Sequence, residues 1–200
     1  MITPAYSTTI TTYSDLPTWQ AATTGDTTDT FTGYAPAGSY TMYGGGIFQN
    51  GVEFIGISGS TGVADTSSGA FSWANVGTGD AGFVSGTTGI NITLTTPVTA
   101  FGINLFTSNP AAAYTITTLS QPSTVQTNSG APPIFFGVTS DTAFSSVSLS
   151  VPAGTTYAFF DNFSFGTADV GDPVPEAGTF LLIGTGLMGF ALFRSRRQPR

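Results

Sequence analysis

The sequence contains no histidine, no cysteine and no lysine. Without histidine, Ser-His-Asp catalysis and imidazole metal sites are excluded. Without cysteine, disulfide bonds, thiolate metal sites and Cys-His catalysis are excluded, although this does not decide the compartment. Without lysine, the phosphate-binding loop that needs a Gly-Lys-Ser/Thr sequence is also excluded. Carboxylates therefore remain as the acid–base groups of the chain.

Basic residues are absent from residues 1–193, and the four of the chain all lie in its last seven positions: Arg194, Arg196, Arg197 and Arg200. The formal net charge is −7, and all 11 acidic residues precede these arginines. A surface without cations cannot replace the counterions along phosphates, so we expect no nucleic-acid partner. The body is rich in Thr, Ser, Gly and Asn instead, which we interpret as the composition of an exported surface protein.

Residues 1–166 show the pattern of an all-β domain. Residues 90–94 and 147–151 alternate between apolar and polar side chains, the period of strands with one solvated face. Further runs of β-branched and aromatic residues are Thr8–Tyr13, Val52–Ser58, Val98–Phe106, Ala113–Thr118, Ile134–Thr139 and Tyr157–Phe165. Many short strands between turn signals predict an antiparallel β-sandwich, and we favour the jelly-roll type.

One short N-terminal helix is predicted beside these strands. Ser14 can cap it, Pro17 is tolerated in its first turn, and Gly25 can end it. A single helix on a β body is expected to close one open end of the sandwich. Within it, we interpret Trp19 as an anchor in the core rather than as a platform for a ligand.

Residues 167–173 lack periodicity and contain Gly, Pro and two Asp, which predicts a linker to a C-terminal tail at residues 174–200. The tail begins with Val174, Pro175 and Glu176 and continues with an uncharged apolar run at residues 178–193. As a helix this run spans about 24 Å, slightly less than the ~30 Å hydrocarbon core of a bilayer. We therefore predict a transmembrane helix that holds the membrane weakly. The arginine cluster after it acts as a cytoplasmic stop and places the body outside the inner membrane.

The motif, the apolar span and the arginine-rich end, in this order, resemble the C-terminal sorting signal of PEP-CTERM proteins. Pro175 and Glu176 match the first two positions of the Pro-Glu-Pro motif, and Ala177 stands in place of its second proline. The resemblance implies an exported Gram-negative protein whose tail is recognised and processed by the membrane protease exosortase. It also implies release to the cell envelope or the extracellular matrix, often alongside exopolysaccharide production.

Members of this family carry a signal peptide. Residues 1–6 show neither a basic n-region nor an apolar h-region. We therefore expect an in-frame extension upstream that encodes the signal peptide.

No catalytic residue is predicted in the body. A glycosidase needs two carboxyl groups about 5–10 Å apart. The spacing of Glu53 and the aspartates Asp65, Asp80, Asp141 and Asp161 selects no such pair. We therefore expect a non-enzymatic protein of the envelope or matrix.

A carbohydrate-binding module is the alternative. Trp73 is a candidate for stacking on a sugar, and Asp161 and Asn162 are candidates for ligand binding. The last two lie in a phenylalanine-rich segment at residues 159–166, where we expect them to form a bend or bulge. That segment resembles the final strand of PEP-CTERM ectodomains, whose sandwiches are similar to galactose-binding-like modules.

No cofactor or metal site is predicted. Calcium at Asp65, Asp80 or the Asp161–Asn162 pair is the alternative to the simpler role of such residues in turns.

Overall fold

In a computed structural model, the chain separates into two units, Met1–Asp169 and Val170–Arg200. The structure describes residues 8–57, 60–65, 80–85, 89–106, 113–126, 132–151 and 157–169, all of which belong to the first unit. The predicted tail at residues 174–200, with its transmembrane helix at residues 178–193, lies outside the described residues. Within the described part of the chain, no helix combines the length and the apolar character needed to cross a membrane.

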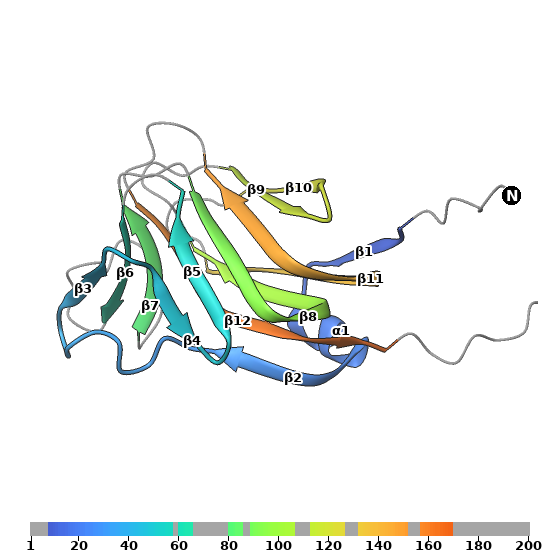
Figure 1. Ribbon diagram of the computed structural model, residues 1–200, viewed down its shortest axis with the longest axis horizontal. Coiled ribbons are helices and arrows are strands. Elements are labelled where there is room, and N and C mark those ends of the chain that lie inside the picture. Colours follow the sequence, from blue (N-terminus) through green and yellow to red (C-terminus); the bar gives the residue numbers. More distant parts are fainter. Residues whose placement is uncertain are drawn as a thin grey trace, which may run out of the picture. The chain divides into compact units, whose positions relative to one another are not determined.

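The first unit confirms the predicted all-β class, since its described residues form antiparallel strands and one short helix (Figure 1). In chain order the elements are β1 (Ile10–Tyr13), α1 (Leu16–Ala21), β2 (Thr23–Asp29), β3 (Tyr40–Tyr43), β4 (Ile47–Gln49), β5 (Val52–Gly56), β6 (Ser60–Asp65), β7 (Asp80–Ser85), β8 (Gly89–Leu105), β9 (Ala113–Thr118), β10 (Gln121–Gln126), β11 (Ile134–Ser150) and β12 (Tyr157–Ala168). The strands follow one another in the order β10-β9-β11-β8-β12-β7-β6-β3, with β1, β2, β4 and β5 attached to it.

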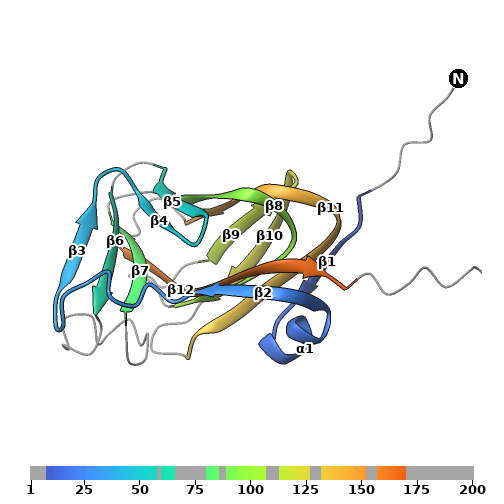
Figure 2. The same cartoon turned by 60° about the horizontal axis from the view of Figure 1, so that its bottom comes forward.

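Three long strands, β8, β11 and β12, organise this sheet. The first part of β8 pairs with β5, and its last part pairs with β12. Likewise, β11 pairs with β1 near its start and with β9 near its end. The long strands change partners along their length, and the sheet curves back on itself (Figure 2). Its buried apolar side chains form one cluster. The sequence pattern divided β8 and β11 into two short runs each, whereas both are continuous strands.

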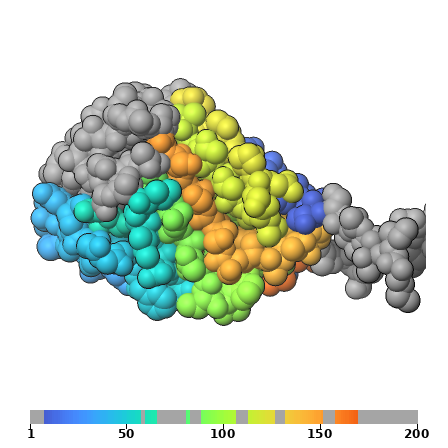
Figure 3. All heavy atoms as spheres, turned by 45° about the horizontal axis from the view of Figure 1, so that its top comes forward, coloured from blue at the N-terminus to red at the C-terminus, as the bar shows by residue number. Residues whose placement is uncertain are grey.

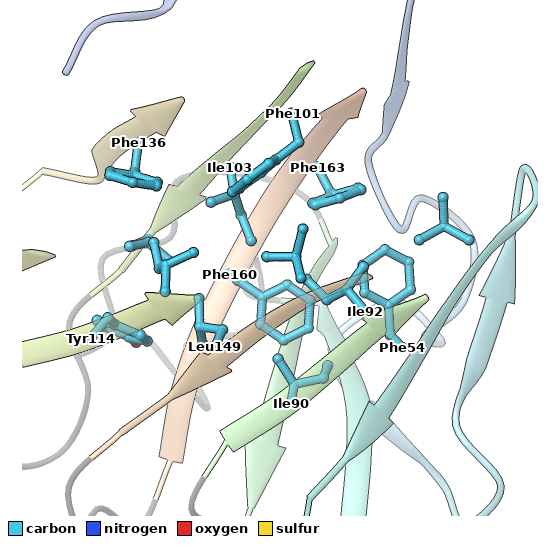
Figure 4. Close-up of a cluster of buried hydrophobic side chains, with 14 of the residues drawn as sticks. Phe54, Ile90, Ile92, Phe101, Ile103, Tyr114, Phe136, Leu149, Phe160 and Phe163 are labelled. Atoms are coloured by element: carbon cyan, nitrogen blue, oxygen red, sulfur yellow. The ribbon is translucent and has the colours of Figure 1, made fainter. Parts of the chain in front are cut away.

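The core consists of side chains that alternate toward one face of these strands. Its central members in Figure 4 are Phe54, Ile90, Ile92, Phe101, Ile103, Tyr114, Phe136, Leu149, Phe160 and Phe163. The rings of Phe101 and Phe163 are stacked with centroids 6.0 Å apart. The hydroxyl of Tyr114 donates to the carbonyl oxygen of Phe106 at 2.9 Å, so its burial leaves no polar group unpaired.

The helix α1 begins one residue later than the sequence predicted. Asp15 rather than Ser14 is the N-cap, because its Oδ1 accepts a hydrogen bond from the backbone N–H of Thr18 at 2.9 Å. The helix ends at Ala21, and Gly25 already belongs to β2, where its φ is +66°. Ala22 is the C-cap, and the strand-forming threonines Thr23 and Thr24 follow it, so the helix ends before the glycine.

The helix covers the outer face of the sheet rather than an open end. Trp19 is fully buried, as predicted, and its Nε1 donates to the backbone of β11. Gly102 in β8 is paired with Gly137 in β11, and a Cβ on Gly137 would lie 2.5 Å from Trp19 and 2.8 Å from Phe135. Because successive residues of a strand point to opposite faces and Phe101 points into the core, these glycines point outward. The glycine pair thus makes room for the two rings.

The strand β2 has no apolar side chain, and the sequence pattern did not reveal it. It pairs with β12 from Phe163 to Ala168, and the backbone N–H of Ala168 also donates to Oγ1 of Thr99 at 2.7 Å. Thr167 and Ala168, the first two residues of the predicted linker, therefore belong to the strand. Backbone pairing with β2 holds these two residues in the strand, although their side chains show no alternation of apolar and polar residues.

Candidate functional site

Asp161 and Asn162 are the predicted site residues that the structure describes. Trp73 lies outside the described residues. The same holds for the sorting residues Val174, Pro175 and Glu176 and for the arginines Arg194, Arg196, Arg197 and Arg200. The site is therefore built from the body, starting at the predicted pair.

The pair forms a bulge in β12, as predicted. The register against β8 shifts between Asp161 and Ser164, and Asn162 has a φ of +49°, a left-handed conformation that asparagine tolerates better than most residues. The backbone N–H of Asn162 donates to Oδ1 of Asp161 at 2.7 Å, and its Nδ2 donates to Oδ2 at 3.1 Å. Asp161 thus acts as a positioning residue for its neighbour.

Beside the bulge, a groove of about 220 Å³ lies on the outer face of the sheet. Asn104 of β8 is paired with Phe135 of β11 on one side and with Asp161 of β12 on the other. This row brings three strands that are far apart in the sequence to one place. Phe135, Asn104 and Asn162 line the groove, whereas Asp161 is not part of the lining and accepts hydrogen bonds from Asn162.

The other lining residues come from α1, β2 and the end of the bulge. Leu16 and Gln20 lie four residues apart, on one face of α1. Thr28 and Ser164 are joined by a hydrogen bond of 2.8 Å between their hydroxyl groups. Leu16 keeps 37% of its surface exposed, so the groove offers one aliphatic wall and one aromatic wall.

The groove carries polar groups but no charge. None of its lining side chains is acidic or basic. The side-chain amides of Gln20 and Asn104 make no hydrogen bond to any residue that the structure describes, and Oδ1 of Asn162 makes none either. Three amides with unused donors or acceptors therefore surround a partly exposed ring.

A second uncharged hollow of about 340 Å³ lies on the outer face of β8, β9 and β11. Asn91, Thr93, Thr117, Ser146 and Ser148 line it, together with neighbours of which none is aromatic. Figure 3 shows the green, orange and yellow segments of these strands side by side on one face. This hollow offers hydroxyl groups and one amide, but no ring.

Two of the carboxylates named as calcium or catalytic candidates, Asp65 and Asp141, accept hydrogen bonds from the backbone. Asp65 accepts a hydrogen bond from the backbone N–H of Gly38 at 2.6 Å. Asp141 accepts one from the backbone N–H of Thr9 at 3.0 Å, which lowers the pKa of its carboxyl group. In the described ranges, no three acidic side chains gather in a way that would hold a metal ion.

Asp29, which the sequence pattern did not single out, is the carboxyl group in the most unusual surroundings. It is fully buried, and its Oδ2 has no hydrogen-bond partner among the described residues. Burial raises its pKa to about 6, although Asn50 donates to its Oδ1 and opposes the rise. Perturbed carboxyl groups often mark catalytic sites. Asp29 has no exposed surface, and its hydrogen bond from Asn50 joins β2 to the turn between β4 and β5.

Comparison with protein families finds a match in the tail. Residues 173–197 match the family model described as the PEP-CTERM protein-sorting motif. The match includes Val174, Pro175 and Glu176, the apolar run and three of the four arginines, and it confirms the resemblance seen in the sequence. Comparison of the chain with curated proteins and with solved structures found no match.

Proposed function

Because residues 173–197 carry a PEP-CTERM protein-sorting motif, which implies an exported protein sorted by exosortase, we propose a destination and a role for the body. The body is a non-enzymatic surface protein that reaches the cell envelope or the extracellular matrix. The family match in the tail is the observation that carries this proposal.

In the proposed pathway, the apolar run at residues 178–193 crosses the inner membrane and the arginines stay on its cytoplasmic side. Exosortase recognises Pro175 and Glu176. A proline keeps the residue before it extended and has no N–H to donate, so the motif enters the enzyme as an extended strand. Residues 170–173 separate the motif from Asp169, the last described residue of the body.

A structural role suits the body as the structure describes it. Its buried carboxyl groups serve turns or the core, and we propose no catalytic step for it. We also propose that its strands form a jelly-roll sandwich. The antiparallel pairing and the one-sided alternation of apolar residues in β8 and β9 support this architecture.

The test is the mass of the protein recovered from cells with and without exosortase. We expect the full-length chain in the membrane when the protease is absent, and a chain without its C-terminal tail when the protease is present. The double variant Pro175→Ala, Glu176→Ala should stay full-length in both strains. A C-terminal tag that remains on the wild-type chain in the presence of the protease would refute the proposal.

A second candidate function is binding of carbohydrate by the body. One observation favours it: Asn162, a predicted ligand residue, lines an uncharged groove together with an aromatic ring. Binding of this kind would retain the protein in a polysaccharide matrix after release from the membrane.

A further inference from the structure

We infer that the groove between α1 and the β8–β12 bulge binds a neutral saccharide. This inference rests on the second proposed function, the binding of carbohydrate by the body. The amides of Gln20, Asn104 and Asn162 hydrogen-bond the hydroxyl groups of the saccharide, and Phe135 packs against the apolar face of a sugar ring. Three properties of the groove support this inference: the polarity of its side chains, its lack of charge and its rigidity.

The polar groups of the groove match hydroxyl groups. A side-chain amide carries both donors and an acceptor, and a sugar hydroxyl group likewise donates and accepts. Gln20 and Asn104 have all of these positions unused within the described residues, and Asn162 has its Oδ1 unused. A ligand rich in hydroxyl groups satisfies them, whereas a purely apolar ligand would bury them without partners at a cost.

The charge around the groove excludes anions. No lining residue is basic, and the first arginine of the chain is Arg194 in the tail. The carboxylate of Asp161 is hydrogen-bonded to Asn162, which lines the groove. An acidic sugar would therefore meet a like charge and no counter-charge. The ligand is neutral.

The groove is organised before any ligand arrives. Asp161 holds the backbone and the amide of Asn162, and the pairing of β8 with β11 and with β12 fixes the backbone position of Asn104. The ring of Phe135 lies over the glycine pair and 5.9 Å from the ring of Trp19. Fixed side chains lose little conformational entropy on binding, which favours a weakly binding class of ligand such as sugars.

The size of the groove limits what it holds. Its volume of about 220 Å³ is below the range of about 300–1,000 Å³ that is typical for drug-sized ligands. We therefore expect it to enclose a single sugar ring of a longer chain. The hollow at Asn91 is larger but has no aromatic wall, so it offers no ring on which a sugar could pack.

The experiment is calorimetric titration of the full-length chain, purified in a detergent without a sugar headgroup. The probes are neutral hexasaccharides of glucose, mannose and galactose, with hexamannuronate as the anionic comparison. We expect saturable binding of at least one neutral probe and none of hexamannuronate.

Two groove variants and one control test the site. Asn162→Gly removes the amide at a φ that glycine adopts without strain. Asn104→Thr removes the other amide and introduces threonine, which is favoured in strands. Each should weaken binding about 2- to 10-fold, as expected for the loss of uncharged hydrogen bonds. Asn91→Thr, the same change on the exposed face of the same strand, should leave the affinity unchanged.

The inference is wrong if no neutral probe binds, if hexamannuronate binds more tightly, or if Asn91→Thr weakens binding while the groove variants do not. Because the chain is unprocessed in this experiment, such a result leaves sorting by exosortase untouched. Conversely, a failure of sorting does not affect the titration.

Discussion

Asn50 donates a hydrogen bond from its Nδ2 to Oδ1 of the buried Asp29, at a distance of 2.5 Å. The bond joins the turn between β4 and β5 to the end of β2. The second carboxylate oxygen of Asp29 has no partner among the described residues. Because burial penalises the charged form, the pKa of this carboxyl group is raised to about 6, although the hydrogen bond from Asn50 opposes the rise.

The free energy of unfolding should therefore depend on pH through the protonation of Asp29. The pKa of Asp29 rises from 3.8 to about 6 in the folded chain, so the folded state keeps this proton to a higher pH than the unfolded state does. Its contribution is therefore most favourable below about pH 4 and is lost as the pH rises to about 6. The loss amounts to about 3 kcal/mol of unfolding free energy. Asp29→Asn should remove most of the decrease in unfolding free energy with rising pH, as measured by urea unfolding from pH 4 to pH 8.

Asp141→Asn is the matched control, since the pKa of this exposed carboxyl group is lowered by the N–H of Thr9. Its contribution appears above its unfolded pKa and disappears in more acidic solution, so it should leave the slope between pH 5 and pH 7 unchanged. Equal slopes in wild type and Asp29→Asn would contradict the assignment.

The glycine pair under α1 should tolerate no side chain. In Gly137→Ala the new Cβ would lie 2.5 Å from Trp19, so the indole must shift and its hydrogen bond to Val138 must weaken. We expect a loss of about 1–3 kcal/mol, seen as a lower melting temperature. Gly45→Ala, where nothing lies within 4 Å of the new Cβ, should change the stability by less than about 0.5 kcal/mol. Similar melting temperatures for both variants would argue against the packing described.

The hydroxyl of Tyr114 should contribute measurably to stability although it lies in the apolar core. It donates to the carbonyl oxygens of Phe106 at 2.9 Å and Phe159 at 3.3 Å. Tyr114→Phe keeps the ring but removes both bonds. We expect a loss of about 0.5–1.5 kcal/mol in urea unfolding at neutral pH. An unchanged midpoint would mean that these carbonyl oxygens find other donors.

The arginines should set the orientation of the tail. Replacing Arg194, Arg196, Arg197 and Arg200 by glutamine should increase the fraction of chains whose body stays in the cytosol. The reason is that positively charged residues beside a transmembrane segment stay on the cytoplasmic side of the membrane. Protease added to spheroplasts measures the exposed fraction. Asp172→Asn should leave this fraction unchanged, since acidic residues contribute little to orientation. Full exposure of the arginine-free chain would contradict the proposed stop.

Local patterns predicted part of the body well. The alternation at residues 90–94 and 147–151 identified strands, and the buried Trp19 anchors α1 as expected. The pattern missed β2 because its threonines and aspartates have no apolar face of their own. It also missed Phe135, although one of the two adjacent phenylalanines in a strand has to point away from the core.

By itself, the sequence determined the β class of the body and the order of motif, apolar run and arginines in the tail, because both are properties of neighbouring residues. Only the tertiary structure decided that Gln20, Asn104, Phe135 and Asn162 line one groove, and that Asp29 is buried. These relationships depend on strand register and on the position of a helix over a glycine pair. Such pairings join residues between 29 positions apart, as Leu105 with Ile134, and 145 positions apart, as Thr23 with Ala168, so no local pattern contains them.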